Sequence, residues 1–144
     1  MFKKLICIFL LLYSYASFAQ NVQYGNNNLA LLPSAAQTGA TIVSPDQNNL
    51  FFRGGHFIIN VTAYTSGTYT PHIQGKDPIS GTYYDILVGT AISATGITII
   101  KVYPGIGASV NAASPDILPQ LWRVELIGAT SPSMTISFSA MLDQ

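Results

Sequence analysis

Apolar and polar residues alternate along several short stretches of the chain. In residues 56–65 every second position from Phe57 to Ala63 is apolar, and residues 120–128 and 134–142 repeat the pattern. A period of two with many β-branched residues is typical of half-buried β-strands. We therefore expect each of these stretches to turn its apolar side toward a core.

Turn-forming residues divide the alternating stretches from one another. Ser66-Gly67-Thr68, residues 77–81 (DPISG), Pro104-Gly105 and Ser131-Pro132-Ser133 combine Gly, Pro, Asp and Ser, which favour turns. We expect residues 107–119, which lack apolar periodicity, to form a loop. The remaining segments predict about seven to nine short strands: 38–44, 49–53, 56–65, 69–76, 82–88, 91–94, 96–103, 120–128 and 134–142.

This spacing of short strands, without a convincing helix among them, predicts an all-β fold. Strands that recur with turns between them favour an antiparallel β-sandwich, either jelly-roll or immunoglobulin-like, or a barrel. We assign residues 38–144 to one β-sandwich domain. The Asn- and Gln-rich residues 20–37 are expected to form an extended N-terminal arm or linker, either ordering against a partner or remaining a free tail.

The first 19 residues have a different character. Lys3 and Lys4 precede a continuous apolar run, and Ser17-Phe18-Ala19 places small residues at the −3 and −1 positions of a cleavage site. This is the pattern of a secretory signal peptide, and the apolar run is shorter than the roughly 20 residues that span a bilayer. We expect residues 1–19 to be cleaved and the protein to be exported; the alternative is an uncleaved membrane anchor.

The charge and cysteine content narrow the classes of function. Charged residues make up 8% of the chain, and beyond residue 19 there are four basic and six acidic residues. No basic cluster follows Lys4, so binding to nucleic-acid phosphates is not expected. The one cysteine, Cys7, lies within the predicted signal peptide. We expect no disulfide in the exported chain, although its compartment would permit one.

Catalytic and metal-binding patterns find little support in the sequence. The two histidines, His56 and His72, do not occur in HxH or HExxH spacing, and no serine lies in a GxSxG motif. Asp77 and Asp85 are a candidate carboxylate pair, but turn formation by Asp77 and a solvated Asp85 are the preferred interpretation. We predict no enzymatic activity, no cofactor and no metal site.

One weaker metal alternative stays open. Asp46 and Asp116 each follow a Ser-Pro pair, and the alternative is that these loop carboxylates bind Ca²⁺ with the help of backbone carbonyls, since such a site needs six to eight oxygen ligands.

Aromatic residues offer the best candidates for a binding surface. Five tyrosines lie around the central strands, and exposed tyrosines suit contacts with sugars or proteins. The candidate contact surface comprises Tyr64, Tyr69, Tyr83, Tyr84 and Tyr103. The alternative is that about half of them cover the core and the sheet edges. Trp122 is predicted to be a core residue because it alternates in phase with Val124 and Leu126, with Arg123 and Glu125 on the outer face.

Several patches in order resemble one group of known proteins. The patches are residues 58–63 (IINVTA), 73–84 (IQGKDPISGTYY), 94–96 (ATG), 102–105 (VYPG) and 116–124 (DILPQLWRV). Over about residues 34–142 the chain resembles small β-sandwich proteins encoded in the structural gene clusters of tailed bacteriophages and prophages, candidate head-decoration or tail-accessory proteins. The resemblance implies a virion-associated assembly protein that contacts copies of itself or other virion proteins, and it carries no catalytic motif.

A signal peptide is unusual for virion proteins of that kind, because they assemble in the cytoplasm. A second hypothesis is therefore an exported surface or carbohydrate-binding module, adhesin-like in character, whose partners are glycans. The first hypothesis predicts a homo-oligomer that depends on residues 20–37. The second predicts a monomer whose glycan binding is lost when Tyr83 or Tyr84 is replaced by alanine.

Overall fold

The computed structural model describes residues 27–144. The predicted signal peptide, residues 1–19, and the first part of the predicted arm, residues 20–26, lie outside the described residues. From residue 27 to 144 the chain contains strands and turns and no helix, which confirms the all-β prediction.

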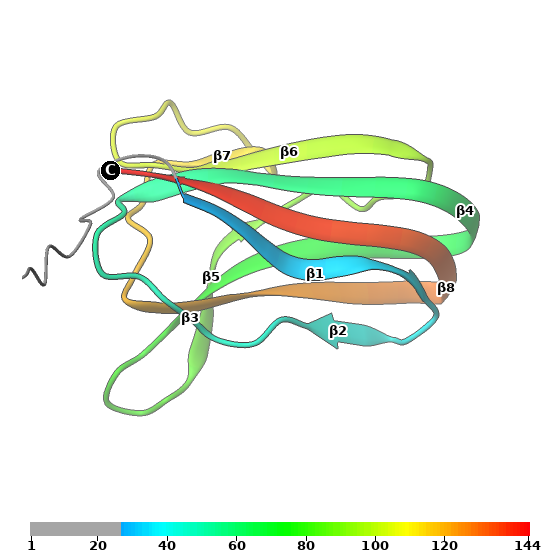
Figure 1. Cartoon of the computed structure of the whole chain (residues 1–144), viewed down its shortest axis with the longest axis horizontal. Coiled ribbons are helices and arrows are strands. Elements are labelled where there is room, and N and C mark those ends of the chain that lie inside the picture. Colours follow the sequence, from blue (N-terminus) through cyan, green and yellow to red (C-terminus); the bar gives the residue numbers. More distant parts are fainter. Residues whose placement is uncertain (1–26) are drawn as a thin grey trace, which may run out of the picture.

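Eight strands form one mostly antiparallel open sheet (Figure 1), within the predicted range of seven to nine. The main path of the sheet runs in the order β1-β8-β4-β6-β7, so β1 and β7 are its end strands. Off this path, β2 and β3 pair with β8, and β5 pairs with β4. The β6–β7 pair is parallel and the other pairs are antiparallel. The strand bounds are β1 Asn27–Gln37, β2 Thr41–Val43, β3 Gln47–Asn48, β4 Gly54–Lys76, β5 Tyr83–Val88, β6 Gly96–Val102, β7 Ala113–Ser114 and β8 Leu121–Asp143.

Two long strands organise the sheet. β4 and β8 have 23 residues each and pair with one another over almost their whole length. Both ribbons double back at the same end of the molecule (Figure 1). The register shifts between Val61 and Thr68, where β4 bends, and Thr130 and Ser131 in β8 have φ angles of 56° and 52°.

The sequence pattern predicts that a strand ends at each of these bends. Residues 56–65 and 69–76 are expected to be separate strands, as are residues 120–128 and 134–142, but each pair forms one continuous strand. Gly67 supplies a φ angle of 70° at the bend of β4, so the turn chemistry bends the strand without ending its pairing.

The hydrophobic core contains side chains from both halves of β4 and of β8. Phe57, Ile59 and Ile73 of β4 are fully buried, and Trp122 packs edge-on against Phe57 with ring centroids 5.5 Å apart. These positions confirm the predicted inward faces and the core position of Trp122. Ala63 is exposed, contrary to its predicted inward position, because the bend interrupts the alternation. The other buried hydrophobic residues of this core, in the part of the chain that the structure describes, are Leu31, Val61, Tyr69, Leu87, Ile92, Ile100, Val102, Leu118, Val124, Leu126, Met134, Ile136, Phe138, Ala140 and Leu142.

Residues 27–37 of the predicted N-terminal arm form β1. This strand is extended, as expected, and pairs with the second half of β8 from Asn27 opposite Leu142 to Gln37 opposite Met134. Leu31 reaches the core, where 4% of its surface is exposed. The described part of the arm is thus an edge strand of the sheet.

Three shorter segments differ from the predicted strands. Residues 49–53 form a connection between β3 and β4, because Asn49 uses its side chain to hold a loop. Residues 91–94 contribute only an isolated bridge, from Ile92 to Tyr69. The predicted loop at 107–119 is mostly irregular but contains β7, which pairs with Lys101 and Val102.

Candidate functional site

The structure does not bring the five candidate tyrosines together. Tyr64 lies opposite Met134 at the bend, whereas the hydroxyl of Tyr103 donates to the carbonyl of Gln144, 2.8 Å away at the C-terminus. The bend and the C-terminus lie at opposite ends of the molecule (Figure 1). Tyr83 and Tyr84 are neighbours on β5, and 47% of Tyr84 is exposed. The tyrosines therefore occupy separate places instead of one patch.

Tyr69 is a core residue and not part of a contact surface. None of its surface is exposed, and its hydroxyl donates a 2.7 Å hydrogen bond to the carbonyl of Gly39. Burial raises the pKa of Tyr69 because it disfavours the phenolate. This burial contradicts the place of Tyr69 in the candidate contact surface and agrees with the alternative that some of the tyrosines cover the core. Tyr69 lies four positions before the buried Ile73, so the alternation with period two already directs it inward.

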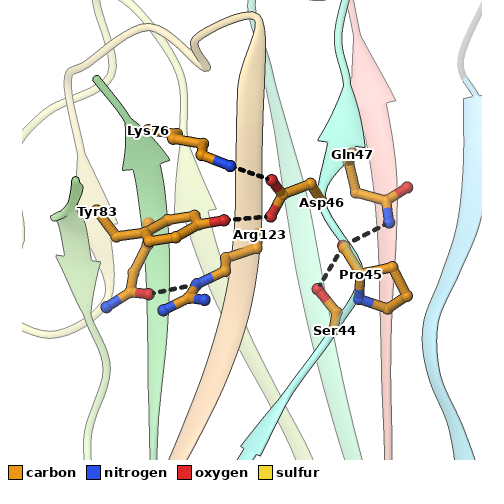
Figure 2. Close-up of polar contacts among 8 residues, drawn as sticks. Ser44, Pro45, Asp46, Gln47, Lys76, Tyr83 and Arg123 are labelled. Atoms are coloured by element: carbon orange, nitrogen blue, oxygen red, sulfur yellow. Dashed lines mark hydrogen bonds and ion pairs between the residues drawn. The ribbon is translucent and has the colours of Figure 1, made fainter. Parts of the chain in front are cut away.

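Tyr83 belongs to a polar cluster on the outer surface (Figure 2). Its hydroxyl donates to Oδ1 of Asp46 at 2.6 Å, and Nζ of Lys76 donates to Oδ2 of the same carboxylate at 2.8 Å. Asp46 lies in the connection between β2 and β3, Lys76 ends β4, and Tyr83 begins β5. Antiparallel pairing places Lys76 directly opposite Tyr83, so one carboxylate can bind both.

A cationic side chain covers the ring of Tyr83. Cζ of Arg123 lies 3.4 Å from the ring centroid, a cation–π contact, and its Nε donates to Oε1 of Gln74 at 2.9 Å. Nε2 of Gln74 donates in turn to Oδ1 of Asp85 at 3.0 Å, and Nδ1 of His72 lies 3.0 Å from the same oxygen. We call the set Asp46, Lys76, Tyr83, Arg123 and Gln74 the Tyr83 cluster.

The charges of the Tyr83 cluster stabilise one another. The hydrogen bond from Lys76, followed by that from Tyr83, lowers the pKa of Asp46 below its usual range. The hydrogen bond to Asp46 raises the pKa of Lys76 for the same reason. The polar groups of the cluster are directed at one another, so the arrangement suits the joining of separate segments.

Asp77 and Asp85, the candidate carboxylate pair, and His72 bond to neighbouring protein groups. Asp77 accepts from the backbone amides of Ile79 and Ser80 and from the hydroxyl of Ser80, which confirms its predicted turn role and lowers its pKa. Asp85 contacts Gln74 and His72. Within residues 27–144, no group of three His, Cys, Asp or Glu side chains has the arrangement of a metal site.

A second surface lies where the connections β3–β4 and β7–β8 meet, and sequence reasoning missed it. Asn49 is buried and joins the two connections: its Nδ2 donates to the carbonyls of Phe52 at 2.6 Å and Leu118 at 2.9 Å. Its Oδ1 accepts from the amide of Phe52 at 2.9 Å. The amide of Leu118 also donates to the carbonyl of Arg53 at 2.9 Å. These bonds hold the two connections in a fixed arrangement.

Large apolar side chains project from these clamped connections. Leu50 is 62% exposed, Phe51 69% and Ile117 58%. We call these three residues the loop-end cluster. The sequence contains them as NNLFF and SPDIL, but nothing in these strings distinguishes an exposed apolar residue from a core residue. The hydrogen bond from Asn49 to Leu118 brings together the two connections that carry them.

No protein-family model matches the chain, and no curated protein matches it at significant similarity. Between residues 27 and 144, no helix is of the length and apolar character needed to cross a membrane.

Proposed function

We propose that this chain is a non-enzymatic structural or assembly protein, a phage-like virion decoration or accessory module that acts through protein–protein contacts. The loop-end cluster carries the proposal. Exposed apolar groups cost free energy in water, and a contiguous exposed apolar surface on a soluble protein commonly marks an interaction site. Phe51 and its neighbours would recover that cost when a partner covers them.

The rigidity of the loops supports a docking role. Asn49 and the Leu118–Arg53 backbone bond hold both connections at fixed geometry. A prearranged surface loses little conformational entropy on binding, so more of the gained contact energy appears as affinity. Aromatic side chains such as Phe51 are enriched in the buried centres of interfaces.

The proposed architecture is a β-sandwich in which the two halves of the folded sheet enclose the core. Burial of residues from both halves of β4 and β8 supports it. The proposal includes homo-oligomerisation and export of the chain after removal of residues 1–19. The proposed location of the protein is a virion, as its resemblance to phage structural proteins implies.

Exposed Tyr84 favours a second candidate function, an exported surface module that binds carbohydrate. A Cβ atom at Gly75 would lie 2.5 Å from Cζ of Tyr84, so the glycine lets the ring lie on the sheet with 47% of the residue exposed. An exposed aromatic ring that packs over a glycine suits stacking against a sugar. Loss of glycan binding in Tyr84→Ala, with Tyr103→Ala as the matched control, would favour this function.

Mass spectrometry of gradient-purified particles, the cell envelope and the medium tests the main proposal. We expect the tryptic peptide of residues 77–101 in particles and an N-terminal peptide that begins at Gln20. Processed protein found only in the envelope or medium would reject the virion function.

Variants then test the surface itself. Phe51→Ser combined with Ile117→Ser is expected to reduce the amount of protein bound per particle by about tenfold or more, as for residues at the centre of an interface. Ile127→Ser is the matched control, because Ile127 is an exposed isoleucine on β8, away from these loops. Equal attachment of the double variant and the control would exclude the loop-end cluster.

A further inference from the structure

Within residues 27–144, one edge of the sheet lacks a strand partner over part of its length. β6 pairs with β4 from Val102 to Gly96, but with β7 only at Lys101 and Val102. Among the described residues, the pairing of β6 on this side therefore stops before Ile100. Residues 96–100 present an open edge of five residues.

The backbone of Ile97 and Ile99 points out of this edge. The amide of Lys101 donates to Ala112 at 2.9 Å and that of Tyr103 to Ser114 at 3.1 Å, both on the side away from β4. In an antiparallel pair the backbone groups of alternate residues point to the same side. Ile99 and Ile97 lie two and four residues before Lys101, so their amide and carbonyl groups also point away from β4. Those of Thr98 face β4.

Two side chains at this edge, Ile97 and Ile99, are apolar and exposed. Ile97 is 67% exposed and Ile99 48%, and the register places Ile58 of β4 directly beside Ile99. No charged residue lies between Gly96 and Ile100. Soluble proteins usually protect such an edge with a charge, a proline or a bulge. The opposite edge strand, β1, carries Pro33 and two register shifts.

We propose that this open edge pairs with the same edge of a second copy of the chain, antiparallel and about a twofold axis at Thr98. The segment Ile97-Thr98-Ile99 is the same in both directions, so it is complementary to itself. Ile97 of each copy lies opposite Ile99 of the other. Both residues have outward backbone groups, so two reciprocal pairs form and supply four hydrogen bonds.

The outer face strengthens the same pairing. Ile58, Ile97 and Ile99 of each copy become one apolar strip that crosses the twofold axis, while the two sheets join into one. Cross-strand pairs of β-branched residues stabilise such a junction. The inference rests on the proposed function as an assembly protein and names the surface through which two copies associate.

The first test is the mass of the chain in solution, measured by size-exclusion chromatography with light scattering. The protein is expressed with its N-terminus intact, so that the host processes it as it does the native chain. We expect a dimer, and we expect Ile99→Lys to weaken it at least about tenfold because each copy then places a charge at the apolar junction. Val110→Lys is the matched control: Val110 is 90% exposed on a loop, and its dimer should persist.

Cross-linking tests the register. In a chain with Cys7→Ser, Thr98→Cys is expected to form a covalent dimer under mild oxidation, because Thr98 faces its own copy in a non-hydrogen-bonded pair, where Cα atoms lie about 4.5 Å apart. Ile97→Cys should not form one, because Ile97 faces Ile99. A monomeric wild-type chain, a dimer unaffected by Ile99→Lys, or equal cross-linking of the two cysteine variants would each overturn the inference.

The particle experiments separate this inference from the proposed function. A dimer that fails to attach to particles would leave the edge pairing standing and reject the virion function. A chain that attaches as a monomer would support the function and overturn the pairing.

Discussion

Asn49 is a single side chain on which the loop-end cluster depends. It is buried, and its amide group satisfies two backbone carbonyls and one backbone amide in two connections that are far apart in sequence. Buried backbone groups that lose their partners destabilise the folded state unless water replaces those partners. The side chain therefore contributes both to stability and to the presentation of Leu50, Phe51 and Ile117.

We predict that Asn49→Ala lowers the free energy of unfolding by about 1–3 kcal/mol, because it leaves these backbone groups without their partners. Urea unfolding followed by circular dichroism measures the change. The neighbouring Asn48→Ala is the control: Asn48 is exposed, and its replacement should change stability by less than about 0.5 kcal/mol. Equal midpoints for the two variants would show that Asn49 does not hold the loops.

At the level of elements, β4 and β8 bend together, and both halves of each strand contribute residues to the core. Gly67 has a φ angle of 70° and lies against Pro132 of β8. A Cβ atom at this position would lie 2.5 Å from Cα of Pro132 and 2.8 Å from the carbonyl oxygen of Ala129. Both contacts are with backbone atoms, which cannot move without disturbing the β4–β8 pairing.

We predict that Gly67→Ala destabilises the fold by about 2–4 kcal/mol, the sum of left-handed backbone strain and overpacking. Gly105→Ala is the matched control, because Gly105 has a φ angle of 84° but open space around its Cβ position. Gly105→Ala should lose only the free energy of the left-handed backbone strain, about 1 kcal/mol. Thermal or urea unfolding of the two variants compares them, and equal losses would mean that the close approach to Pro132 is unimportant.

For the whole molecule, the Tyr83 cluster joins segments that the chain order keeps apart. It links the β2–β3 connection to β4, β5 and β8 through one carboxylate, one ammonium, one phenol and one guanidinium group (Figure 2). Asp46 binds protons less readily in the folded chain than in the unfolded chain, because Lys76 and Tyr83 donate to its carboxylate. Protonation of Asp46 therefore favours unfolding.

We predict that the contribution of Asp46 to stability is complete above the usual aspartate pKa of about 3.9 and is lost as the pH falls through its lower folded-state pKa. Asp46→Asn should cost less than about 1 kcal/mol near neutral pH, because water screens this surface pair. Urea midpoints of wild type and Asp46→Asn between about pH 6 and pH 2 should converge at the acidic end. A constant difference across this range would show that the carboxylate charge is not involved.

The two proposed surfaces serve different contacts in the whole molecule. The loop-end cluster is formed by connections, whereas the open edge of β6 is backbone and strand. A chain with both surfaces can join a second copy through β6 and present two loop-end clusters to a particle. Two linked contacts raise the effective affinity for a repetitive surface, as long as both can engage together.

Local sequence determined where most of the strands lie and which of their faces are buried. Alternation with period two is a property of neighbouring residues, so the pattern by itself assigns Phe57, Ile59 and Trp122 to the core, where they lie. The turn at Asp77 was likewise predictable, because the side chain bonds to amides two and three residues ahead. Such features depend on contacts within a few residues.

Tertiary structure decided how those strands continue and what their surfaces carry. Gly67 bends β4 without ending it because the pairing with β8 continues on both sides of the bend, where Gly67 lies against Pro132. Asp46 and Tyr83 form a hydrogen bond although 37 positions separate them in the sequence, and Asn49 and Leu118 do so at a separation of 69. Sequence alone could not predict these contacts, because they arise only when the paired strands bring distant segments to the same place.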